Sequence, residues 1–121
     1  MAKNNRKVVI MSGAARDFSA AEKYGELVFI GLGSTNIVKT DRHIADILKA
    51  LKPLYIENYQ TPPYVLITGH GVLSGLLLLC VMEVWGSCEL LIWDVKENTY
   101  SPAKVSKKVV RNYFNTSEGG K

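Results

Sequence analysis

Residues 64–95 form the densest apolar block of the chain, YVLITGHGVLSGLLLLCVMEVWGSCELLIWDV. A β-branched run at residues 64–67 follows two prolines and is typical of a strand. A glycine-rich turn comes next, and residues 72–85 are apolar at almost every position, which predicts a helix inside the domain. Residues 90–93 are again strand-like, and Asp94 ends them. The block therefore predicts a strand-turn-helix-strand unit whose two strands are parallel and joined by a right-handed crossover.

Upstream of this block, residues 7–12 and 25–32 have strand composition. The loop between them contains a helical turn at residues 20–23, and we expect the two strands to pair as a hairpin with a long connection. A glycine- and serine-containing turn follows the second strand.

The clearest amphipathic helix follows that turn. Thr40 or Asp41 can cap its first free N–H groups, and Pro53 is expected to end it. Apolar residues recur at helical spacing and form one face: Ile44, Ile47, Leu48 and Leu51. His43 is expected on the protein surface.

After the central block, residues 99–105 can pair with the preceding strand, and Pro102 favours an edge strand or a bulge. Residues 106–114 fit a helix capped by Ser106, although their β-branched pair also fits a strand; we favour the helix. Together these elements predict a mixed sheet with helices packed on it, in the α+β or α/β class. We expect one domain over residues 1–121, with a flexible arm at 1–6 and a disordered tail at 115–121.

Composition narrows the functional classes. The chain has 47% hydrophobic and 21% charged residues and a formal net charge of +4, which permits an anionic ligand. The apolar helix is shorter than the roughly 20 residues that span a bilayer, so we expect no membrane segment. The first apolar run is too short for a signal peptide. Cys80 and Cys88 fit no metal pattern and are expected to be free, buried thiols, which is consistent with a cytoplasmic protein.

The first candidate site is the turn Thr68-Gly69-His70-Gly71, followed by Ser74. A helix N-terminus after a strand presents free N–H groups and partial positive charge, which favour phosphate or carboxylate. Glycines let the backbone approach an anion, His70 can act as a donor or as an acid or base, and the two hydroxyls can donate. The alternative is a tight connection in which the glycines serve packing alone.

The second candidate is the turn Gly33-Ser34-Thr35-Asn36, which also follows an apolar strand. If its strand neighbours the strand at residues 64–67, both turns lie at the sheet end where open α/β sheets bind ligands. An ordinary polar loop is the alternative.

Two further features carry charge. A basic C-terminal run can hold a nucleic-acid backbone or form a solvated face: Lys104, Lys107, Lys108 and Arg111. Asp94 sits at a strand end, where catalytic carboxylates often lie. No cluster at metal-ligand spacing accompanies it, so we expect neither a metal nor a cofactor.

The central block resembles one known family. Ile67-Thr68-Gly69-His70-Gly71, the apolar helix and the strand ending at Asp94 are similar to the core of the small CRISPR-associated ring nucleases of type III systems. Members of that family degrade the second messenger cyclic tetra-adenylate. The resemblance covers residues 25–105, and it implies a messenger-binding turn at residues 68–71 and a second site turn that starts at Asp94.

The resemblance also implies changes in the catalytic set. His70 stands where the family has an arginine, Trp85 where it has a histidine, and Lys96 where it has the arginine after the aspartate. Asp94 alone carries over from the family's catalytic residues.

These observations predict binding of a cyclic oligoadenylate-type messenger in CRISPR or other antiviral signalling, with the two glycine turns and Lys96 holding the ligand. A symmetric ligand favours a symmetric dimer or tetramer. If the ring is cleaved, the expected route is metal-independent: His70 acts as acid or base while an adenosine 2′-hydroxyl attacks in line. The alternative is a non-enzymatic oligomeric domain whose basic C-terminal segment contacts RNA or a protein partner.

Overall fold

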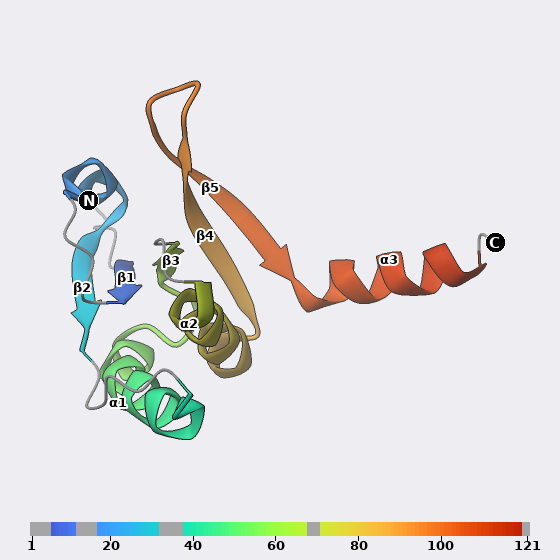
Figure 1. Ribbon diagram of the computed structural model, residues 1–121, viewed down its shortest axis with the longest axis horizontal. Coiled ribbons are helices and arrows are strands. Elements are labelled where there is room, and N and C mark those ends of the chain that lie inside the picture. The colour runs from blue at the N-terminus through green and yellow to red at the C-terminus, as the bar shows by residue number, and fades with distance from the viewer. Residues whose placement is uncertain (1–5, 12–16, 32–37, 68–70, 120–121) are drawn as a thin grey trace.

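The computed structural model describes residues 6–11, 17–31, 38–67 and 71–119 (Figure 1). Five strands, one 3-10 helix and three α-helices follow one another within these ranges. In chain order they are β1 (Lys7–Met11), η1 (Ser19–Tyr24), β2 (Glu26–Ile30), α1 (Thr40–Glu57), β3 (Tyr64–Leu66), α2 (Gly71–Trp85), β4 (Ser87–Asp94), β5 (Thr99–Ser106) and α3 (Lys107–Gly119).

The strands form one mixed sheet in the order β2-β1-β3-β4-β5. The first four are mutually parallel, and β5 returns antiparallel to β4. The predicted parallel pairing across the apolar helix is confirmed, with Val65 opposite Leu90. The hairpin expected between β1 and β2 is wrong, because Val9 pairs with Val28 in parallel register. Parallel neighbours need a crossover, and the connection that contains η1 supplies it.

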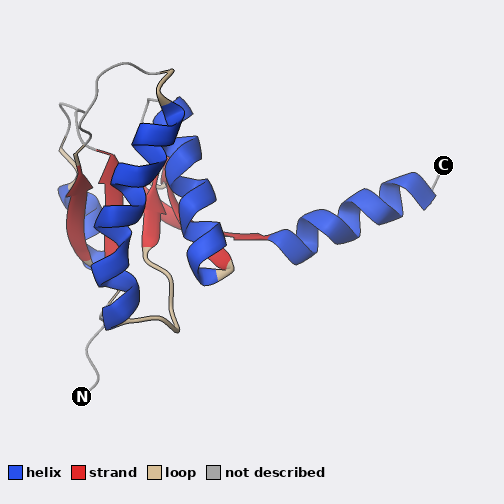
Figure 2. Ribbon diagram, turned by 90° about the horizontal axis from the view of Figure 1, so that it is seen from below, coloured by secondary structure: helices blue, strands red, loops and turns tan. Residues whose placement is uncertain are grey.

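Each face of the sheet carries its own apolar core. α1 and α2 lie side by side over one face (Figure 2) and pack on Val9 and Met11 of β1. Val8 and Ile10 alternate to the opposite face, where they pack with the segment containing Phe18 and η1. After Lys7, the four side chains of residues 8–11 are at most 2% exposed, which explains why this part of β1 is apolar without interruption.

Helix α1 differs from its prediction at both ends. Lys39 occupies the N-cap position, and no side-chain capping hydrogen bond is formed there. Pro53 does not end the helix, which continues to Glu57. Proline removes one backbone donor, but its ring here faces solvent rather than the packed side of the helix. His43, expected at the surface, is only 1% exposed and therefore belongs to the packed side.

The C-terminal elements agree more closely with their predictions from the sequence. β5 is an edge strand that contains Pro102 opposite Leu91, as the proline indicated. The favoured helix is confirmed, and the Ser106 hydroxyl oxygen accepts the Val109 N–H at 3.3 Å. α3 runs to Gly119, so residues 115–119, expected in a tail, continue this helix. No helix within the described ranges is long and apolar enough to cross a bilayer.

Candidate functional site

The carboxyl ends of β1, β2 and β3 lie at one edge of the sheet, because these strands are parallel. From β1 the chain passes to β2 on one side, whereas β3 lies on the other side and leads through α2 to β4. This is the flavodoxin-like order, in which ligands bind outside the carboxyl ends of the strands where the direction of winding reverses. Here that position lies beyond Met11 and Leu66.

Most of the residues expected to bind ligand lie outside the described ranges. Thr68, Gly69 and His70 are in this group, as is the second turn at residues 33–36. The strands before the two turns are not neighbours, since β1 lies between them. Both turns nevertheless follow strands whose carboxyl ends lie at the same edge.

Gly71 and Ser74, the described members of the first turn, differ in exposure. Gly71 is the first residue of α2 and is exposed, and a Cβ added there would meet no atom of the described residues within 4 Å. The described part of the chain therefore leaves space beside the first residue of α2. Ser74, one turn later, is only 4% exposed, so its hydroxyl points into the protein rather than towards the open edge.

Asp94 organises the turn between β4 and β5. One carboxylate oxygen, Oδ1, accepts the N–H of Lys96 at 3.0 Å and that of Glu97 at 3.2 Å. The other, Oδ2, lies 3.5 Å from the Ser101 hydroxyl. Asn98 completes the turn with a φ of 55°, a conformation that asparagine tolerates better than most residues. The carboxylate expected to be catalytic thus has a turn-forming role in the hairpin.

Asp94 also lies beyond the edge formed by the other strands. Leu66, the last residue of β3, pairs with Leu91 of β4. Asp94 is three positions further on, or about 10 Å along the strand at roughly 3.3 Å per residue. Figure 1 shows the β4–β5 hairpin extending past the neighbouring strands. Lys96 is exposed in the turn of this hairpin.

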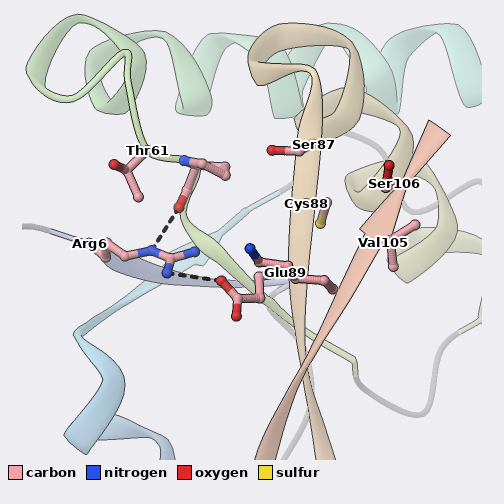
Figure 3. A pocket seen from close by; sticks show the side chains of 9 residues that line it. Arg6, Thr61, Ser87, Cys88, Glu89, Val105 and Ser106 are labelled. Carbon is pink, nitrogen blue, oxygen red and sulfur yellow. Dashed lines mark hydrogen bonds and ion pairs between the residues drawn. The ribbon is translucent and has the colours of Figure 1, made fainter. Parts of the chain in front are cut away.

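The opposite, amino-terminal edge of the sheet contains a pocket of about 470 Å³ (Figure 3). Arg6 lines one side of it; the Arg6 Nε donates to the Pro62 carbonyl at 3.0 Å, and its Nη1 lies 3.0 Å from Glu89 Oε1. The guanidinium also stacks on the Tyr64 ring, 3.8 Å from its centroid. The remaining lining residues come from the ends of β4 and β5 and from the segment before β3: Thr61, Ser87, Cys88, Lys104, Val105 and Ser106.

This pocket has the volume of a small-molecule site but lacks an activated nucleophile. Burial raises the pKa of the Cys88 thiol to about 12, so the sulfur is protonated at neutral pH. The Glu89 carboxylate forms its ion pair with Arg6, and Lys104 lies opposite Glu89 in the β4–β5 register. Sequence reasoning missed this pocket because Arg6 was assigned to a flexible arm. The sequence signal that could have indicated this pocket was an arginine directly before a buried strand.

Among the described residues, no group of three or more His, Cys, Asp or Glu side chains is arranged to hold a metal ion. The basic C-terminal run is divided between two elements. Lys104 belongs to β5, and the others lie on α3, where Lys107 Nζ forms an exposed ion pair with Glu83 Oε2 at 3.0 Å.

The fold and this edge define a small α/β domain with four parallel strands, flavodoxin-like strand order and an antiparallel edge strand. The chain belongs to the family described as phage Pam3 gp32-like protein, whose family model matches residues 3–107. No curated protein and no solved structure matches it.

This family membership corrects the resemblance to CRISPR ring nucleases, because the matching family is a different one. The resemblance rested mainly on an apolar strand-helix-strand pattern. Any buried parallel crossover unit produces that pattern. Asp94, the single catalytic residue carried over, is bonded within its own hairpin turn.

Proposed function

We propose that this protein binds a phosphate-bearing nucleotide at the carboxyl edge of its parallel strands. The observation that supports the proposal is the strand order, which puts the reversal of winding between β1 and β3. Open α/β sheets bind ligands at that position. α2 follows β3 directly, so its N-terminus lies at the same edge.

The local chemistry of α2 favours an anion. The first N–H groups of a helix have no intrahelical partner, and the helix carries about half a positive charge at that end. Gly71 begins α2 with an exposed backbone and open space around it, so a phosphate oxygen can approach closely. The net charge of +4 helps to attract an anionic ligand.

The ligand class is a nucleotide with one or more phosphodiester or phosphate groups, and cyclic oligoadenylates belong to the set to be tested. The CRISPR pathway and ring cleavage are not part of the proposal, since both came from the corrected resemblance. The proposed binding at the carboxyl edge depends on neither the pathway nor the cleavage.

The test is a ligand screen by thermal unfolding and isothermal titration calorimetry. The probes are cyclic tetra-adenylate, cyclic dinucleotides, linear adenosine nucleotides and inorganic phosphate. A ligand of the folded state at about 100 times its Kd stabilises the protein by roughly 2.7 kcal/mol, which raises Tm. We expect at least one nucleotide to do so, and phosphate to act more weakly.

Two glycine variants make the screen specific. Gly71→Val puts a branched side chain where the phosphate approaches, and should weaken nucleotide binding at least tenfold. Gly75→Val is the matched control, because it also adds its side chain in open space but one helical turn further from the edge. A panel without any stabilising nucleotide, or equal affinities for the two variants, would refute the proposal.

A second candidate function is RNA binding by α3. Lys107, Lys108 and Arg111 are exposed on this helix, and a row of cations can contact a phosphate backbone. Lys108→Glu with Arg111→Glu should abolish binding to a single-stranded RNA oligonucleotide, and the wild-type affinity should fall steeply with salt. Salt-independent binding, or binding unchanged by the double variant, would exclude this role.

A further inference from the structure

Helix α3 projects away from the rest of the protein, beyond the sheet and the two helices that cover it (Figures 1 and 2). It is joined to the body at its first turn. Lys107 Nζ forms an ion pair with Glu83 Oε2 of α2, and the Ser106 hydroxyl caps the helix. A helix of 13 residues is marginal in water without packing. α3 therefore needs a surface against which to pack.

The side chains of α3 separate into two arcs. Val109, Val110, Tyr113 and Phe114 fall on one side at helical spacing and are 50%, 62%, 71% and 69% exposed. The cations of the helix fall on the other side. Packing the apolar arc would therefore leave these cations in water.

A second exposed apolar surface lies along the outer side of α2. This helix is apolar at nearly every position apart from the buried Ser74 and the exposed Glu83, although the sheet and α1 cover only its inner side. Val72 and Leu79, two turns apart on the outer side, are 49% and 51% exposed, and Leu76 flanks them. Helices that are apolar all round are normally buried. We name Val72, Leu76 and Leu79 the outer strip of α2.

We propose that a second copy of this chain covers both surfaces, with α3 of each protomer packed on the outer strip of α2 of its partner. The outer strip of α2 spans residues 72–79 and the apolar arc of α3 spans residues 109–114, so both run over about two helical turns. The exchange is reciprocal and gives a closed two-fold dimer in which each protomer covers both exposed apolar faces.

The connection between β5 and α3 argues for a partner rather than for folding back within one chain. β5 ends at Ser106 and α3 begins at Lys107, so no loop residue separates them. Reversal of the chain between packed elements normally needs a loop of two or more residues. The Lys107–Glu83 ion pair shows that the first turn of α3 lies near the C-terminal end of its own α2.

An open groove of about 480 Å³ lies where α3 leaves the body. Met82 of α2 forms one side, and Val110 and Phe114 of α3 are among the residues of the other. Lys107 and Arg111 border it. In the dimer this groove receives apolar side chains from the partner's outer strip, so the interface is continuous from the body to the projecting helix.

The first test measures the mass of the full-length protein by light scattering during size exclusion, over micromolar concentrations. We expect twice the mass of one chain. Leu79→Glu and the double variant Val110→Glu/Phe114→Glu should each shift the equilibrium to monomer at least tenfold. Ile56→Glu is the matched control, since Ile56 is an exposed apolar residue of α1, 71% accessible and away from both surfaces. It should remain dimeric.

The second test identifies which chain supplies each helix. Leu79→Cys and Phe114→Cys proteins are mixed and treated with a bismaleimide; the natural Cys80 and Cys88 are only 4% and 2% exposed and should not react. We expect a cross-link between one chain of each kind. A monomeric wild type, a dimer unaffected by both sets of glutamates, or the absence of a cross-link between the two proteins would overturn the proposal.

Discussion

The Arg6 guanidinium lies 3.0 Å from the Glu89 carboxylate, and this ion pair joins the start of β1 to β4 across the intervening β3. Both side chains are largely buried, at 17% and 20% exposure. Arg6 also donates to the Pro62 carbonyl and stacks on Tyr64. One side chain therefore holds together three segments that are distant in sequence.

Replacing Arg6 should destabilise the fold. Arg6→Ala leaves the Glu89 carboxylate and the Pro62 carbonyl without this donor in a partly buried site, and should lower the free energy of unfolding by about 1–3 kcal/mol. Urea denaturation measures the change. The control is Lys7→Ala, which removes an ion pair of 2.8 Å to Glu26, whose side chain is 72% exposed. Exposed pairs contribute little, so equal losses for the two variants would contradict this account.

Asp94 should prove structural, and two substitutions separate this role from a chemical one. Asp94→Ala removes the acceptor for the Lys96 and Glu97 N–H groups and should cost about 1 kcal/mol of stability. Asp94→Asn retains an acceptor oxygen and should cost less. Denaturation curves of the two variants give the comparison. If alanine and asparagine were equally destabilising, the carboxylate charge rather than the turn would be the important property.

The buried thiols predict a loss of stability in alkali. Burial raises the pKa of Cys88 to about 12 from an ordinary value of 9.0, and it also raises the pKa of Cys80. The unfolded chain therefore releases these protons at lower pH than the folded chain. The stabilisation is complete below the unfolded value and is lost as the pH rises from about 9 towards 12.

The slope from Cys88 should approach 1.4 kcal/mol per pH unit at most. Measurements of unfolding free energy from pH 8 to pH 11 on wild type and Cys88→Ala should show a flatter curve for the variant, although it is less stable at pH 8. Parallel curves would mean that the Cys88 thiol titrates alike in the folded and unfolded chains.

The sequence was sufficient to predict those elements whose structure depends on a local pattern. The continuous apolar run of residues 72–85 predicted α2 and the parallel strands on either side, because a crossover of this length allows few other arrangements. Pro102 predicted an edge strand since it lacks a ladder donor. Ser106 predicted the start of α3 through its capping hydroxyl.

The sequence pattern did not determine how segments that are distant in sequence pack together. β1 and β2 are compatible with either a hairpin or a crossover, and their parallel pairing depends on how η1 packs under the sheet. The contacts of Arg6 form where three segments distant in sequence meet, so no local motif predicts them. His43 sits among charged neighbours in sequence, but the direction of α1 turns it inward.

Helix α1 offers a last test, because Pro53 lies in its interior and has no N–H to donate to the preceding turn. Alanine exceeds proline in helix propensity by about 3 kcal/mol, but losing proline also gives the unfolded chain about 0.4–1 kcal/mol of extra entropy. Pro53→Ala should therefore stabilise the protein by about 2 kcal/mol and raise its Tm.

Lys52→Ala is the matched control for this change, as Lys52 is the adjacent exposed position of the same helix. It should alter the free energy of unfolding by a few tenths of a kcal/mol at most, because lysine and alanine are both good helix formers. Thermal and urea unfolding of both variants provide the measurement. A Pro53→Ala protein less stable than wild type would show that the proline ring contributes packing that its solvent exposure does not indicate.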